Sequence, residues 1–153
     1  MGKTWMWLGI VALLSIAFFT GACGGTSTTG STMTNGAAGM VGQKVLAILD
    51  QGNTVIERDR SIGNQAASFK AISHDFAIMA QGLQVLNFAA SIQADQKTLV
   101  SAFKKLSGDA TEIANAANKT EVRAIATKMD DDEETAKAAS DTLRRDLGLP
   151  SAD

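Results

Sequence analysis

Proline occurs only once in this chain of 153 residues, at Pro150. Proline breaks helices because it lacks a backbone N–H and its ring clashes with the preceding turn, so the long stretch before Pro150 is free to form uninterrupted helices. Between residues 41 and 148 the apolar residues recur at spacings of three, four and seven, which is the period of a helix and not the alternation of a strand. The sequence therefore predicts an all-α fold.

The apolar spacing divides this region into four predicted helices. They are expected at about residues 41–62, 65–91, 95–118 and 120–147. Glycine-containing segments at 51–53 and 107–109 are candidate points at which the first and third helices bend or break. Helices of this length that are joined by short turns pack as antiparallel neighbours, so we expect an up-down-up-down four-helix bundle.

Capping and stop signals accompany these boundaries. Gly63 is expected to end the first helix, and Asp95 and Thr120 are candidate N-caps of the third and fourth helices. Gly148 suits the position just after the last helix, and Pro150 prevents its continuation. The signals therefore favour four separate helices over a few very long ones.

The second predicted helix is apolar on two sides. Its main stripe consists of Phe69, Ile72, Phe76, Met79, Leu83, Leu86 and Ala90. A second stripe lies roughly opposite and consists of Ile78, Val85 and Ile92, with Phe88 near it. A helix with two apolar sides buries both, so it is either the central helix of the bundle or has one side against another chain or a ligand. The second stripe is therefore the candidate partner-contact face.

The first 23 residues have the layout of a secretory signal. A basic start at Lys3 precedes an apolar run from Trp5 to Phe19, and small residues follow at Gly21 and Ala22. At about 1.5 Å per residue, the run of roughly 15 residues covers about 22 Å, which is short of the roughly 30 Å hydrocarbon core of a bilayer. The run suits export better than a permanent membrane span.

The only cysteine of the chain, Cys23, follows directly. Together with Gly21 and Ala22 it resembles the lipobox of bacterial lipoproteins, with Thr20 at the position usually held by leucine. The resemblance implies cleavage after Ala22, a diacylglyceryl group on the Cys23 sulfur and often an acylated new N-terminus, which together anchor a protein stably on a bilayer. Gly24 in place of aspartate implies the outer membrane in a bacterium with two membranes. The alternatives are an ordinary secretory signal with a free thiol and an uncleaved membrane helix.

The chain accordingly divides into four segments. They are a signal peptide at 1–22, a lipidated cysteine with a linker at 23–40, a helical domain at 41–148 and a tail at 149–153. The linker is rich in Gly, Ser and Thr and shows no period, which is typical of a flexible tether. About 16 such residues have an r.m.s. reach of roughly 20–24 Å, which would hold a folded domain just clear of the lipid headgroups.

Composition and motifs argue against several function classes. The net charge is −2, aromatic residues make up 5% of the chain and tyrosine is absent. Nucleic-acid binding requires a basic patch with aromatic platforms, so we expect none. Neither a G-x-S-x-G motif nor a phosphate-binding loop occurs, so we expect no enzyme activity and no cofactor.

His74 is the only histidine. Some helical-bundle cytochromes ligate haem with one His and one Met, and Met79 and Met129 would be the candidate methionines here. His74 lies off the main stripe of its predicted helix, and the C-x-x-C-H attachment motif is absent. We therefore interpret His74 as a surface residue.

Five acidic residues follow one another from Asp130 to Glu134. The run lacks the alternating ligands, turn glycine and distal glutamate of a Ca²⁺ loop, so we interpret it as a solvated helix face. Glu133 lies near the apolar stripe, where a lysine would be its natural partner. Arg144 and Arg145, near the end of the last helix, are expected to interact with the helix dipole.

These features predict a lipid-anchored, non-enzymatic protein of a bacterial envelope, on the periplasmic face of the outer membrane where two membranes exist. It would act by contact with a protein partner or with another copy of itself. The alternative is a ligand- or cofactor-binding bundle, such as a haem carrier or a small-molecule sensor, in which the second helix lines the pocket.

Overall fold

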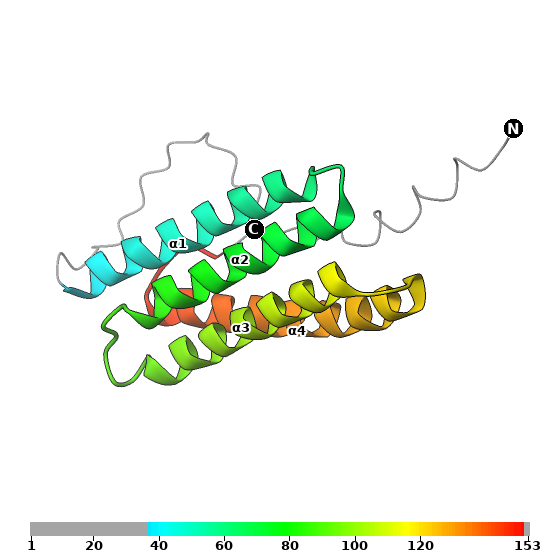
Figure 1. Ribbon diagram of the computed structural model, residues 1–153. Helices are drawn as coiled ribbons and strands as arrows, with labels where there is room; N and C mark the ends of the chain where they lie inside the picture. Colours follow the sequence, from blue (N-terminus) through cyan, green and yellow to red (C-terminus); the bar gives the residue numbers. More distant parts are fainter. Residues whose placement is uncertain (1–36, 152–153) are drawn as a thin grey trace, which may run out of the picture.

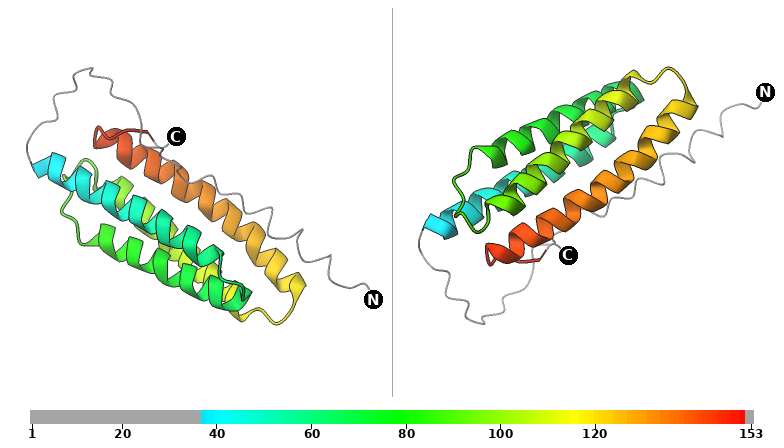
Figure 2. Two further views of the ribbon diagram at one scale, coloured as in Figure 1. Left: turned by 90° about the horizontal axis from the view of Figure 1, so that it is seen from above. Right: turned by 90° about the horizontal axis from the view of Figure 1, so that it is seen from below.

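Four helices and no strand make up the part of the chain that the computed structural model describes, residues 37–151. The helices are α1 (Ala37–Arg60), α2 (Gln65–Gln84), α3 (Gln93–Asn115) and α4 (Lys119–Asp146). They run up-down-up-down and are joined by short connections at alternate ends (Figure 1; Figure 2). The predicted all-α four-helix bundle is confirmed. The predicted signal peptide and Cys23 lie outside the described residues.

Several helix boundaries differ from the prediction. α1 begins at Ala37, inside the predicted linker, where two alanines, the best helix formers, start the helix. α4 is capped by Asn118 and not by Thr120, because the Asn118 side chain accepts hydrogen bonds of 3.0 Å from two backbone N–H groups of the first turn. Asp95 lies in the first turn of α3, whose N-cap is Ile92.

The largest difference is at the end of α2, which ends at Gln84 and not at Ser91. The Gln96 side chain of α3 donates from Nε2 to the carbonyl of Leu83 at 2.7 Å, which satisfies one of the free carbonyls at the end of α2. Phe88 is buried in the core although it lies in the α2–α3 connection. The apolar spacing beyond Gln84 therefore reflects a connection that packs inwards and not a continuing helix.

Of the glycine predictions, Gly63 and Gly148 were right and the two inside helices were wrong. Gly63 lies in the connection that follows α1. Neither 51–53 nor 107–109 interrupts its helix, because the packing of an apolar face outweighs the low helix propensity of one glycine. After α4, Gly148 adopts a φ of 65°, which glycine tolerates without strain. The backbone N–H of Leu149 then donates to the carbonyl of Arg144 at 2.8 Å and closes the helix end.

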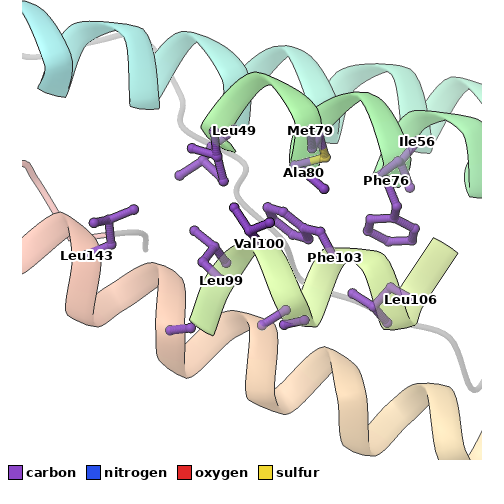
Figure 3. Packing of buried hydrophobic residues seen from close by; sticks show 14 of the residues in the cluster. Leu49, Ile56, Phe76, Met79, Ala80, Leu99, Val100, Phe103, Leu106 and Leu143 are labelled. Carbon is purple, nitrogen blue, oxygen red and sulfur yellow. The ribbon is translucent and has the colours of Figure 1, made fainter. Parts of the chain in front are cut away.

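All four helices contribute to one continuous cluster of buried apolar side chains (Figure 3). Between α2 and α3, the rings of Phe76 and Phe103 stack with centroids 6.0 Å apart. α2 packs against both α1 and α3, and α3 packs against both α2 and α4. Among neighbouring helices, α1 and α4 are the pair whose backbones approach each other least.

Gly52→Ala and Gly108→Ala are expected to change stability in opposite directions. Alanine is favoured over glycine inside a helix by about 0.5–1 kcal/mol. A methyl group at Gly108 would meet no atom within 4 Å, so Gly108→Ala should gain that amount. A methyl group at Gly52 would overlap the buried Met79 side chain, and such overpacking costs about 1–3 kcal/mol. Urea unfolding measures both changes, and a stabilised Gly52→Ala would contradict the tight packing of α1 on α2.

Candidate functional site

The four residues of the second stripe, the predicted partner-contact face, do not share one environment in the structure. Ile78 and Val85 are exposed, at 52% and 76% of their surface, and lie two helical turns apart along α2 and its C-cap. Phe88 is buried, with 5% exposed, and Ile92 is half-buried against the core. Phe88 and Ile92 therefore do not belong to an exposed face, because they follow the end of α2 and turn inwards.

The predicted lipidation site precedes the described range, so the lipobox remains a prediction. Of the four helices, none combines the length and the hydropathy that crossing a bilayer requires, as far as residues 37–151 are concerned.

His74 lies on the surface of α2, as predicted. Met79 and Met129, the methionines considered as haem ligands, are both buried in the core. Within the described part of the chain, no three His, Cys, Asp or Glu side chains are grouped so that they could hold a metal ion. The histidine and the two methionines face different environments, and their placement does not favour haem ligation.

The acidic run from Asp130 to Glu134 is not a uniformly solvated face. Asp132 and Glu133 are buried, whereas the other three members are exposed. Five consecutive residues exceed one helical turn, so part of the run must point towards the core. Asp132 accepts a hydrogen bond from Nζ of Lys105 on α3 at 3.3 Å. The expected lysine partner therefore belongs to Asp132 and not to Glu133.

A charged cluster joins α3 to α4. Asp109 of α3 has only 1% of its surface exposed and pairs with Lys128 of α4. Burial raises the pKa of Asp109; the hydrogen bond from Lys128 opposes this rise, and the neighbouring Asp132 adds to it. The carboxyl group of Asp109 therefore binds a proton more tightly than that of an exposed aspartate would.

A second acidic pair joins α1 to α2. Asp59 and Asp75 are both buried. The pKa of Asp75 is raised, first by burial and then by the charge of Asp59. The pKa of Asp59 is lowered, chiefly by the hydrogen bond of 2.7 Å that Arg58 donates to it. The Ser68 hydroxyl donates to the backbone carbonyl of Asp59 at 2.7 Å and ties the start of α2 to the end of α1.

A third buried acid, Glu133, lies on the inner side of α4. Its Oε1 has no hydrogen-bond partner among the described residues. Burial raises the pKa of Glu133 to about 7; the positive charge of Arg60 on α1 opposes this rise, and the negative charge of Asp130 adds to it. Near neutral pH, Glu133 is therefore divided between its neutral and charged forms.

Arg144 is buried between α4 and α1, although it was expected to serve the dipole of α4 together with Arg145. Its Nη2 lies 3.7 Å from Oδ1 of Asp50 on α1, and its Nη1 donates to the carbonyl of Pro150 at 3.4 Å. Arg145 is exposed and bonds the adjacent Asp146 at 3.1 Å. Arg144 therefore links α1, α4 and the tail. Both arginines lie in the last turn of α4, as predicted, but only Arg145 is exposed.

Sequence reasoning missed most of these buried acids, although one signal was present. Asp109 lies three residues after Leu106 and four residues before Ile113, and both of those residues are in the core. An acid at such a position shares the inner face of its helix. Because burial raises the pKa values of Asp75, Asp109 and Glu133, the chemistry that these sites offer is proton uptake linked to helix packing.

No protein-family model, no curated protein and no solved structure matches this chain. Its function has to be argued from its own residues and from the geometry described above.

Proposed function

We propose that this chain is a lipid-anchored protein of a bacterial envelope whose helical body acts by contact and not by catalysis. The observation that carries the proposal is the position of the only cysteine, Cys23, directly after Gly21 and Ala22 at the end of a basic and apolar leader. The helical body itself contributes no helix suited to crossing a bilayer within residues 37–151, so a lipid on Cys23 would provide the attachment. Gly24 favours the periplasmic face of an outer membrane where there is one.

Mass analysis of the N-terminal peptide from the exported protein tests the anchor. The expected product begins at Cys23 and carries the added mass of a diacylglyceryl group, with or without a further acyl chain. Cys23→Ala is expected to lose all acyl label, whereas the linker variant Ser27→Ala should keep it. A bare sulfur on Cys23, or a leader still attached in the wild type, would contradict the anchor.

Contact with a partner is expected at Ile78, midway along α2, where a large apolar side chain is exposed to water. A photocrosslinking residue at Ile78 in intact cells should give an intermolecular product, and the same residue at exposed Ala66 should not. A product of twice the mass identifies self-association, and any other mass identifies a protein partner. Absence of a product from Ile78 would refute the contact proposal.

A further inference from the structure

The most exposed large apolar side chains gather at one end of the bundle. Met40, in the first turns of α1, is 66% exposed, and Val85, the C-cap of α2, is 76% exposed. Because α1 and α2 are antiparallel, the start of one lies beside the end of the other (Figure 1). We call this end, made of residues 37–44, 85–95 and 145–151, the linker end, because the predicted linker enters it.

Most of the linker end is uncharged, and the charged residues of its three segments are two basic ones, Lys44 and Arg145, and two acidic ones, Asp95 and Asp146. From residue 76 to residue 94 the chain contains no Asp, Glu, Lys or Arg, and the first charged residue of α1 is Lys44. The opposite end is rich in charge, with Glu57, Arg58, Asp59 and Arg60 before the α1–α2 turn and Lys119, Glu121 and Arg123 after the α3–α4 turn. Charged groups are costly to bring into contact with apolar material, so the two ends suit different surroundings.

The α2–α3 connection is held so that Val85 points outwards. Phe88 is buried and fixes the middle of the connection in the core. Gln93 donates from Nε2 to the carbonyl of Phe88 at 3.3 Å, and Gln96 donates to the carbonyl of Leu83 at 2.7 Å. Val85 is therefore exposed at the start of a connection whose other exposed residues, Asn87, Ala89, Ala90 and Ser91, are uncharged.

We propose that the linker end rests on the lipid surface in which Cys23 is anchored, with Met40 and Val85 in contact with the headgroup layer. The inference rests on the proposed lipid anchor. The linker of 13 residues between Cys23 and Ala37 has an r.m.s. reach of about 20 Å, which keeps this end closest to the bilayer. Such a tether holds the end at a high effective concentration near the lipid, so two apolar side chains are enough for a contact that would be weak without the anchor.

Exposed basic groups border this surface. Lys44, Lys97 and Arg145 are exposed at or beside the linker end, where the acidic groups are the half-buried Asp95 and the exposed Asp146. Arg145 bonds Asp146 at 3.1 Å, so Lys44 and Lys97 are the basic groups left to interact with lipid. Basic side chains beside an apolar contact are attracted by anionic lipids. Ile78 lies about two helical turns before Val85 in α2 and is therefore farther from this end. It is the residue of the protein contact proposed above. The bilayer is therefore the occupant that the position of the linker and the low charge of this end favour.

Tryptophan quenching by brominated lipid tests the orientation in the full chain. The two natural tryptophans are Trp5 and Trp7. The substitutions Trp5→Phe and Trp7→Phe remove them, so all tryptophan fluorescence then comes from the one introduced tryptophan. The reporters are Val85→Trp and Met40→Trp, and the control is Ala66→Trp, exposed at the opposite end. Each protein is extracted from the cell envelope and reconstituted in vesicles of phosphatidylcholine and phosphatidylglycerol, with and without dibrominated phosphatidylcholine.

Quenching of both reporters should exceed that of Ala66→Trp by about twofold or more, because brominated chains reach only residues at the headgroup and acyl boundary. Equal quenching of the three tryptophans would overturn the proposal. Circular dichroism checks that each variant keeps its helices, and Met40→Trp carries the test if Val85→Trp does not fold.

The lipid anchor on Cys23 and the contact of the linker end with lipid are separate proposals, and each can be refuted without the other. Mass analysis of the same preparation shows whether Cys23 is acylated. If its sulfur is bare, the anchor proposal fails, and the thiol is then coupled to a maleimide-bearing lipid in the same vesicles. Stronger quenching of the reporters in that state supports the orientation, and equal quenching refutes it.

Discussion

Phe103→Ala is expected to lower the free energy of unfolding by about 3–5 kcal/mol, the usual cost of removing a buried phenyl ring from a core. Phe103 is buried and stacks on Phe76 between α2 and α3, the two helices that each pack against two neighbours. The lost ring removes apolar burial and leaves a cavity at the centre of the bundle (Figure 3). A loss of this size is a large part of the total stability of a domain this long.

Chemical denaturation followed by circular dichroism measures the change. Lys104→Ala is the matched control, because Lys104 is the next residue of the same helix and is exposed. Its expected effect lies within about 0.5 kcal/mol, as for most surface substitutions. If Phe103→Ala and Lys104→Ala had similar effects, Phe103 could not be part of the core described here.

Raising the pH from 5 to 8 is expected to weaken the folded bundle, and Glu133→Gln should remove a large part of that change. The folded-state pKa of Glu133 is about 7, against 4.5 for an ordinary glutamate. Its contribution to stability is fully present below the unfolded pKa and is lost as the pH rises through the folded pKa. At about 1.4 kcal/mol per pKa unit, the loss from this group reaches roughly 3 kcal/mol.

Burial of Glu133 is the main cause of this effect, and its charged neighbours adjust the size. Arg60 of α1 favours the charged form, and Asp130 disfavours it. On the α3 side, Lys105 is bonded to the adjacent Asp132. The raised pKa values of Asp75 and Asp109 act in the same direction, so the wild type must be compared with Glu133→Gln and not only with itself at another pH.

The measurement is the free energy of unfolding of both proteins at pH 5, 6, 7 and 8, a range that brackets the folded-state pKa of about 7. Glu134→Gln serves as the control because Glu134 is the exposed neighbour, and it should leave the pH dependence of the wild type unchanged. Identical pH profiles for the wild type and Glu133→Gln would show that Glu133 is not desolvated in the folded protein.

Local features of the chain were predictable and long-range ones were not. The four helices follow from apolar period, and Gly148 follows from the need for a positive φ after α4. The end of α2 was placed seven residues too late, at Ser91 instead of Gln84, because Leu86 and Ala90 continue the spacing of the main stripe. In the structure Leu86 and Phe88 pack against the core from the connection. That spacing cannot distinguish a helix from a connection that folds its apolar residues onto the same core.

For the candidate sites, too, local features could be predicted and long-range ones could not. The surface position of His74 could be predicted, because it lies off the apolar stripe of α2. The exposure of Ile78 and Val85 could not, because it depends on which sides of α2 are covered by α1 and α3. The burial of Asp132 and Glu133 within an acidic run was missed, because the run as a whole is polar.

The sequence by itself determined that this chain forms four helices with apolar faces, because helical period, caps and the lack of proline act within a few residues of each other. Only the tertiary structure decided where α2 ends and which acids are buried. Both depend on groups from other helices: Gln96 of α3 bonds the end of α2, and Lys128 of α4 pairs with Asp109. The spacing of Asp109 from Leu106 and Ile113 places it on the inner face of α3, but its partner and the end of α2 have no local signature, since these contacts exist only once the helices are packed.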